Sequence, residues 1–267
     1  MEGLYKEVRV EIAFENLSLD LKTNNKRILH NLNGKFRAGR LTCIMGPSGS
    51  GKTTLLSAIS GKAPYANVVG DIKINGVKSS MKKFKNVCAF VQQEDCMHRE
   101  LTVEECIYFS ARTRLNAKVS QKTIDSIVDG VIQILDLNHV RHSIIGDETK
   151  RGISGGQRKR VSIAMELVAC PYVLFLDEPT SSLDAYSSFE VSKAMKDIAS
   201  SGITVVAVLH QPRFEIFEMF DDVVLLGNGG RIVYMGPSKD ALNYFSEKLQ
   251  LEPPPFVNPS DFFLDAI

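Results

Sequence analysis

Polar and apolar residues alternate along the first part of the chain. Apolar side chains occupy every second position over residues 8–14 and again over residues 17–21, with charged residues among the positions between them. A period of two is typical of strands that have one face in water and one in the core. This stretch therefore predicts an antiparallel strand pair, and Asn24 with Asn25 predicts the turn that follows it.

Later strands show a different pattern, in which apolar residues follow one another without alternation. That pattern is typical of parallel strands buried on both faces. Strands of this apolar type are predicted at residues 41–45, 86–91, 173–176 and 203–209. Two hairpins are predicted as well, one around Asn75 and Gly76 and one in which residues 223–226 and 231–235 flank a turn at 228–230.

Helical stretches alternate with these strands. Residues 52–60 predict a helix that stops at Gly61, and Thr102 with Glu105 has the capping-box spacing of a helix that runs to about residue 114. Further helices are predicted from Ser120, over residues 185–200, from a cap at Ser238 to about residue 248, and from Ser260 onwards. Residues 98–152 show helices and loops but no strand pattern, so they predict a helical subdomain inserted into a sheet domain.

Composition and charge narrow the function classes. The chain has 32 Lys plus Arg against 31 Asp plus Glu, a net charge of +1, so no bulk positive field favours nucleic acid as a partner. No run of 18 apolar residues occurs that would predict a membrane span. The five cysteines form no C-x-x-C pair, which favours reduced thiols over disulfides or a zinc site.

The candidate chemistry begins in a glycine-rich loop between the strand at 41–45 and the helix at 52–60. The loop matches the P-loop pattern G-x-x-x-x-G-K-[ST], whose fixed positions are Gly46, Gly51, Lys52 and Thr53. Glycines let backbone N–H groups converge on phosphates, and the helix N-terminus adds its positive dipole end. We expect Lys52 to reach the β- and γ-phosphates of a nucleoside triphosphate and the Thr53 hydroxyl to bind Mg²⁺. The residues expected to hold the nucleotide here are Gly46, Pro47, Ser48, Gly49, Ser50, Gly51, Lys52, Thr53 and Thr54.

An acidic pair follows the buried strand at 173–176. A carboxylate at the end of a buried strand beside the P-loop strand can hold Mg²⁺ through its waters, and we assign this role to Asp177. The next residue, Glu178, is placed to polarise the attacking water as a general base.

A third motif makes the pattern specific. Ser154, Gly155, Gly156 and Gln157 stand at a predicted helix start, where two glycines again suggest a backbone site for an anion. The motif comes after the P-loop and just before the Asp177 strand. This order resembles the nucleotide-binding domain of an ABC ATPase, in which a serine-glycine-glycine signature lies between the P-loop and the acidic strand.

The resemblance implies further roles. Gln93 matches the glutamine that joins the Mg²⁺ site to the helical subdomain, and His210 matches the histidine that contacts the γ-phosphate. Residues 181–184, ending in Asp184, match a loop that runs along the dimer seam. The resemblance thus gives Lys52, Glu178 and His210 as catalytic residues, and Thr53, Gln93 and Asp177 as metal ligands. It adds Gln93, Ser154, Gly155, Gly156, Gln157 and Asp184 to the nucleotide-binding set.

The resemblance also gives the fold class. We expect an α/β fold with a P-loop (RecA-like), mostly parallel sheet core, an N-terminal antiparallel β-subdomain and an inserted α-helical subdomain. Residues 1–267 are expected to form one ABC ATPase domain, in which 1–97 and 153–250 make the core with the antiparallel subdomain and 98–152 the helical subdomain. Residues 251–267 are expected to start a linker towards a transmembrane domain absent from this chain.

Stretches at 178–185, 210–213, 216–221 and 258–265 are similar to the G (White) subfamily of half-transporters. The resemblance implies a Mg²⁺-dependent ATPase that pairs head to tail with a second nucleotide-binding domain, as a homodimer or heterodimer. It implies export of lipids, sterols or other amphipathic molecules, and a place on the cytoplasmic face of a membrane. The nearest alternatives are the ATPase subunit of an ABC importer and a soluble ABC ATPase. One departure is that Leu21 stands where the family commonly has an aromatic residue that stacks on adenine.

Overall fold

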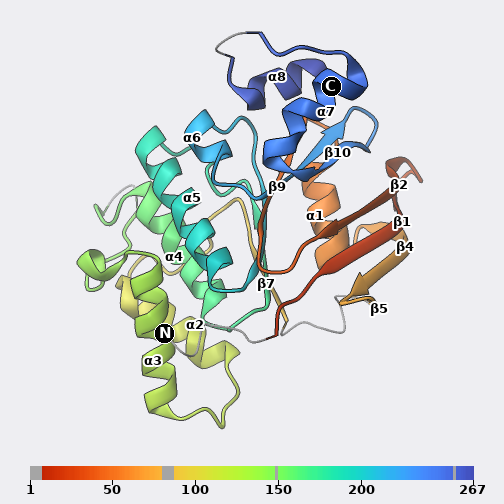
Figure 1. Ribbon diagram of the computed structural model, residues 1–267. Coiled ribbons are helices and arrows are strands. Elements are labelled where there is room, and N and C mark those ends of the chain that lie inside the picture. The colour runs from red at the N-terminus through yellow and green to blue at the C-terminus, as the bar shows by residue number, and fades with distance from the viewer. Residues whose placement is uncertain (1–7, 80–86, 148–149, 255–256) are drawn as a thin grey trace.

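The computed structural model describes residues 8–79, 87–147, 150–254 and 257–267, which form two sheets with helices around them (Figure 1). The first sheet is antiparallel with strand order β2-β1-β4-β5. Its strands are β1 (Ile12–Leu21), β2 (Arg27–Phe36), β4 (Ala66–Ile74) and β5 (Val77–Lys78). Asn75 and Gly76 make the predicted turn between β4 and β5.

The first alternating stretch is one strand and not the predicted pair. β1 runs through both halves and pairs with β2 on one side and β4 on the other. Its register shifts around Asn16, whose φ is 51°. Such an irregularity inserts an extra residue, so buried positions change from even numbers (Ile12, Phe14) to odd numbers (Leu17, Leu19). The sequence pattern missed β2 because polar residues interrupt its alternation.

The second sheet has strand order β10-β9-β3-β8-β7-β6. Its strands are β3 (Leu41–Met45), β6 (Cys88–Val91), β7 (Val173–Asp177), β8 (Thr204–Val208), β9 (Asp222–Gly227) and β10 (Arg231–Pro237). All neighbours are parallel except β9 and β10, which form the predicted hairpin. The predicted α/β fold with a mostly parallel core and an N-terminal antiparallel sheet is confirmed.

Both faces of the parallel sheet are buried, which explains its unalternating sequences. In β7, Val173 and Phe175 face the core shared with α1 (Lys52–Ser60) and the antiparallel sheet, while Leu174 and Leu176 face the opposite core. Figure 1 shows α1 between the two sheets and the other large helices beyond the parallel sheet. A parallel sheet covered in this way needs apolar residues at every position.

The helices agree closely with the sequence pattern. They are α2 (Val103–Arg114), α3 (Gln121–Ile134), α4 (Gly155–Leu167), α5 (Ala185–Ser200), α6 (Phe214–Phe217), α7 (Ala241–Leu249) and α8 (Pro259–Ala266), with 3-10 turns η2 (Asn138–Val140) and η3 (Ser238–Asp240). Thr102 makes the predicted capping box with Glu105, and Ser120 caps α3. Within the described part of 98–152 there is no strand, apart from an isolated bridge between Thr102 and Ile144.

The prediction that Ser238 caps the helix that follows it is wrong. Ser238 starts the 3-10 turn η3, and its hydroxyl donates to the Phe220 carbonyl at 2.5 Å. α7 then begins at Ala241 without a side-chain cap. The hydroxyl bonds instead to Phe220, which lies 18 residues earlier in the sequence, and local spacing does not reveal such a tertiary contact.

The chain ends in a helix that packs against the domain. Asn258 caps α8, and Pro259 occupies its first turn. Phe262 and Phe263 are buried and lie against Phe245, with ring centroids 5.7 and 5.0 Å away. In the parts of the chain that the structure describes, no helix combines the length and the apolar character needed to cross a membrane.

Candidate active site

The glycine-rich loop connects the end of β3 to the start of α1. A Cβ on Gly46 would lie 2.2 Å from the Leu226 carbonyl oxygen, and one on Gly51, whose φ is 96°, would lie 2.9 Å from a Leu29 methyl. These close approaches explain why glycine stands at both positions. The loop is thus held against β9 and β2 on either side.

Lys52 is buried inside this loop. Its Nζ donates to the carbonyl oxygens of Gly46 at 2.8 Å and Pro47 at 2.9 Å, and the residue is 6% exposed. Burial lowers the pKa of Lys52. An ammonium has three N–H donors, so these two bonds leave one for an anion.

The residues of the loop fit a phosphate group. The Ser50 hydroxyl is buried and has no hydrogen-bond partner among the described residues, so it remains available to a ligand. Backbone N–H groups at the start of α1 and the neighbouring Lys52 add positive potential. Loop, hydroxyl and ammonium together make a site for an anion.

Thr53 and Asp177 bring two oxygens together beside the loop. The Thr53 hydroxyl donates to Oδ1 of Asp177 at 2.9 Å, across 124 positions of sequence. Burial raises the pKa of the Asp177 carboxyl. One carboxylate with a hydroxyl suits Mg²⁺, which keeps waters and phosphate oxygens as its other ligands. The described residues contain no cluster of three or more His, Cys, Asp or Glu, so a site built only from such side chains is not found there.

Glu178 follows with a backbone conformation that is rare outside glycine. Its φ is 48°, its N–H donates to the Val208 carbonyl at 3.2 Å, and its own carbonyl accepts from the Ser181 hydroxyl at 2.9 Å. Such strain persists where the surroundings enforce it, and it is common at functional sites. β8 and the loop after Glu178 therefore fix where its side chain starts.

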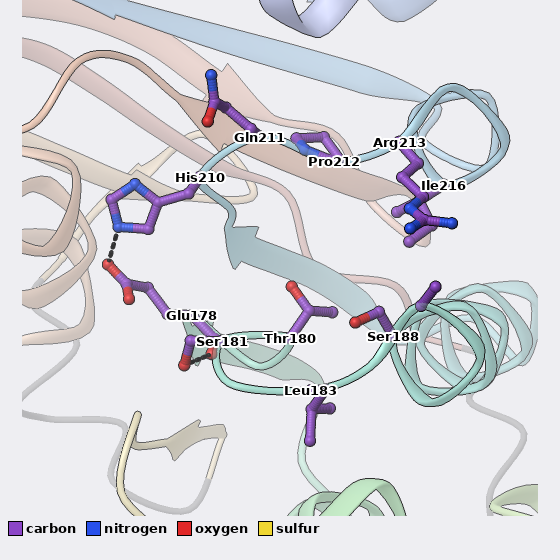
Figure 2. A pocket seen from close by; sticks show the side chains of 11 residues that line it. Glu178, Thr180, Ser181, Leu183, Ser188, His210, Gln211, Pro212, Arg213 and Ile216 are labelled. Carbon is purple, nitrogen blue, oxygen red and sulfur yellow. Dashed lines mark hydrogen bonds and ion pairs between the residues drawn. The ribbon is translucent and has the colours of Figure 1, made fainter.

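Both carboxylate oxygens of Glu178 have partners. Oε1 lies 2.6 Å from His210 Nε2, and Oε2 accepts from Gln93 Nε2 at 2.8 Å. A carboxylate accepts but does not donate, so the Nε2 of His210 carries the proton of this bond. Figure 2 shows Glu178 and His210 meeting at one end of a cavity of about 300 Å³, with Arg213 and Ile216 at the other end.

The serine-glycine-glycine motif forms the N-terminus of α4. Ser154 and Gln157 make a reciprocal capping box: the Ser154 hydroxyl accepts from Gln157 N–H at 3.3 Å, and Ser154 N–H donates to the Gln157 side chain at 2.8 Å. The amide nitrogen of the same Gln157 side chain lies 3.1 Å from Nε2 of His139. The Gln157 side chain is thus engaged within its own chain, whereas the Ser154 hydroxyl keeps its proton to donate.

The two glycines of the motif differ in how tightly they are packed. A Cβ on Gly156 would lie 2.7 Å from the Ser187 Cβ, while one on Gly155 would lie 3.3 Å from a Leu183 methyl. Asp184 caps α5 by accepting from the Ser187 N–H at 2.9 Å and its hydroxyl at 2.7 Å, and these bonds lower the pKa of Asp184. α4 and α5 therefore meet at Gly156.

The predicted site residues fall into two groups. Lys52, Thr53, Gln93, Asp177, Glu178 and His210 converge through the contacts above, with the glycine-rich loop beside them. Ser154, Gly156, Gln157 and Asp184 line a separate hollow of about 340 Å³, which shares no lining residue with the cavity at Glu178. The predicted site residues thus form two separate groups, one at Glu178 and one at Ser154.

Sequence reasoning missed two contributors. Ser187, which completes the cap at Asp184, looks like an ordinary helix residue. Lys159 lies in the basic run after the motif, where a solvated side chain would be expected, but it is 4% exposed. Its position in the first part of α4, shortly after the N-cap Ser154, was the available signal.

Comparison with known proteins identifies the family of the chain. A family model described as ABC transporter matches residues 29–181, and one described as ABC-2 type transporter matches residues 210–267. ABC transporter G family member 28 of Arabidopsis thaliana is 45% identical over 262 residues, which are 98% of this chain and 24% of that protein. ABC transporter G family member 25 of Oryza sativa subsp. japonica is 43% identical over 96% of this chain and 25% of its own length. ABC transporter G family member 1 of Dictyostelium discoideum is 42% identical over 92% of this chain and 31% of its own. The chain spans about a quarter to a third of the length of these relatives.

Proposed function

The chain belongs to the ABC transporter family and is similar to its G family, and from that premise we propose that it binds and hydrolyses ATP with Mg²⁺ to drive transport. The observation that carries the proposal is the pair of bonds on Glu178. Gln93 and His210 hold its carboxylate beside the Thr53–Asp177 pair and the phosphate-binding loop. A general base needs such fixed geometry next to its substrate.

Each residue then has a defined task. The glycine-rich loop and Lys52 bind the β- and γ-phosphates, and Thr53, Asp177 and Gln93 provide oxygens for Mg²⁺. The metal ion, when bound, would neutralise charge on the phosphate oxygens. Glu178 accepts a proton from the attacking water, while His210 orients its carboxylate. Catalysis of phosphoryl transfer is mostly positioning and electrostatics, which is what these side chains supply.

We propose that the group at Ser154 is half of a second site, which a partner completes. Ser154 and the glycines after it are presented at the N-terminus of the 13-residue helix α4, away from this chain's own phosphate loop. A head-to-tail pair of such domains would place each Ser154 hydroxyl and helix N-terminus against the other's phosphates. The partner is a second nucleotide-binding domain, identical or related.

We propose the transport role for an assembly larger than this chain. Most of the length of the relatives is not matched by this chain. A second family match assigns residues 210–267 to ABC-2 type transporters, so the expectation that the transmembrane domain is absent from this chain is not supported. The described residues of that range fold as α6, β9, β10, η3, α7 and α8. We propose that the domain works on the cytoplasmic face of a membrane, together with membrane-spanning segments that export lipids, sterols or other amphipaths.

The decisive experiment replaces Glu178 by Gln. The variant should bind ATP and form an ATP-dependent dimer in light scattering, while phosphate release falls about 10²-fold or more, because general-base catalysis contributes that much. Glu15→Gln is the matched control, since Glu15 pairs with Lys73 in the antiparallel sheet. Unchanged hydrolysis in Glu178→Gln would reject Glu178 as the base. Hydrolysis absent from the parent chain as well would reject the proposed ATPase activity for this chain.

A further inference from the structure

Lys159 is a buried lysine whose ammonium group points into the protein. It lies on α4 and is 4% exposed. Its Nζ contacts Oδ1 of Asp95 at 2.6 Å, the Gln93 carbonyl at 2.8 Å and the Gln92 carbonyl at 3.5 Å. The Gln93 and Gln92 carbonyls accept hydrogen bonds from this ammonium and Asp95 forms an ion pair with it, so all three contacts go to the same short segment after β6.

That segment has little else to fix it. Gln92 and Gln93 are exposed, and Asp95 is half-buried. Among the described residues, the only other side-chain hydrogen bond to the backbone of residues 92–95 is the one from Arg99 to the Asp95 carbonyl at 3.3 Å. Lys159 is therefore the main tie between this segment and α4. Burying an ammonium is unfavourable unless it is paired and hydrogen-bonded, so the contact is a specific one.

The contact between Lys159 and Gln93 also affects the position of the Glu178 carboxylate. The Gln93 carbonyl is held by Lys159, and the Gln93 side chain donates to Oε2 of Glu178. A shift of the Gln93 backbone would carry its amide away from the carboxylate. We propose that Lys159 is a positioning residue for hydrolysis, which holds Gln93 in reach of Glu178 and links that contact to the helix that begins at Ser154. The inference rests on the proposed function, because it takes Glu178 as the base.

The proposal differs from a purely structural role in what it predicts. If Lys159 only stabilised the fold, its loss would lower the melting temperature, and restored stability would restore activity. A positioning role lowers kcat at nearly constant KM for ATP, since the phosphate loop is untouched. Loss of an outer-shell contact at an active site typically costs about 10- to 100-fold in activity.

The test compares Lys159→Met, Asp95→Asn and the double variant with the parent chain. Lys196→Met is the matched control. Lys196 lies on α5, outside the site, and its Nζ contacts Oδ1 of Asp221 at 2.7 Å. Lys159→Met should lower kcat about 10- to 100-fold and change KM for ATP by less than about twofold. The double variant removes the unpaired carboxylate, so it should recover melting temperature without recovering kcat. Recovery of both, or a kcat for Lys159→Met equal to that of Lys196→Met, would overturn the proposal.

A second readout does not need turnover. Hydrogen–deuterium exchange of the peptide over residues 92–97 should be about tenfold faster in Lys159→Met than in Lys196→Met, since local opening governs exchange. Equal exchange would overturn the proposal even if the parent chain proved unable to hydrolyse ATP. Failure of the proposed function would instead appear in the phosphate release of the parent chain and of Glu178→Gln.

Discussion

Nε2 of His210 lies 2.6 Å from Oε1 of Glu178, although 32 residues separate them in the chain. β8 delivers His210 at its end, and β7, its parallel neighbour, delivers Asp177 and then Glu178. Neighbouring parallel strands end at the same edge of the sheet, so the two side chains meet there.

This contact predicts how His210 variants behave. His210→Ala should lower kcat about 10²-fold while ATP still binds, because the Glu178 carboxylate then loses the partner of Oε1 and keeps only the bond from Gln93 to Oε2. His210→Gln should lose less, since its amide can still donate to the carboxylate. Phosphate release and calorimetric ATP binding measure the two effects. Loss of ATP binding in His210→Ala would contradict the assigned role.

The buried carboxyl of Asp177 predicts a pH-dependent stability. Burial, aided by the charge of Glu178, raises the pKa of Asp177 in the fold, and the Thr53 bond offsets this in part. Its ionised form is therefore disfavoured in the fold, and stability falls as pH rises from the ordinary value of 3.8 through the folded pKa. Asp177→Asn should melt a few degrees higher than the ligand-free parent at pH 7, with the gap closing towards pH 4.

Two observations would check this. The control Asp71→Asn, at an exposed ion pair with Lys78, should show no such gain. Saturating Mg-ATP should stabilise the parent more than Asp177→Asn, because a ligand stabilises only the state that binds it. A melting point for Asp177→Asn below that of the parent at pH 7 would contradict the burial argument.

The tight packing of Gly156 predicts that alanine lowers the free energy of unfolding more at Gly156 than at Gly155. Gly156→Ala should cost about 1–2 kcal/mol of unfolding free energy, because its Cβ would press on Ser187 at 2.7 Å. Gly155→Ala meets only the end of the Leu183 side chain at 3.3 Å and should be nearly neutral. Urea unfolding measures both. Equal costs would mean that α5 moves aside freely.

A variant at Ser154 can test its proposed phosphate contact without removing its role as the cap of α4. Ser154→Asp can still cap α4, so its melting temperature should stay close to that of the parent. Its carboxylate would repel the phosphates of a partner's nucleotide, so the ATP-dependent dimer should weaken by about tenfold or more. Thr102→Asp, at the capping box of α2, is the matched control and should dimerise normally. A normal dimer in Ser154→Asp would contradict the partner role.

The sequence by itself determined the features that depend on neighbouring residues. The loop at 46–54, the helix at 52–60 with its Gly61 stop, the capping box at Thr102 and the apolar strands all follow from local spacing. It also gave the order of the motifs, and with it the family and the candidate residues. These signals are readable because backbone conformation and burial impose a period on the chain.

Only the tertiary structure decided how those residues meet. The irregularity at Asn16 joins two half-patterns into one strand, and Phe220 draws the Ser238 hydroxyl away from a helix cap. Lys159 turns inward from a basic run because Asp95 and the Gln93 carbonyl lie where it can reach them. Contacts of this kind join positions tens of residues apart, and their energies depend on distances that only the folded chain defines.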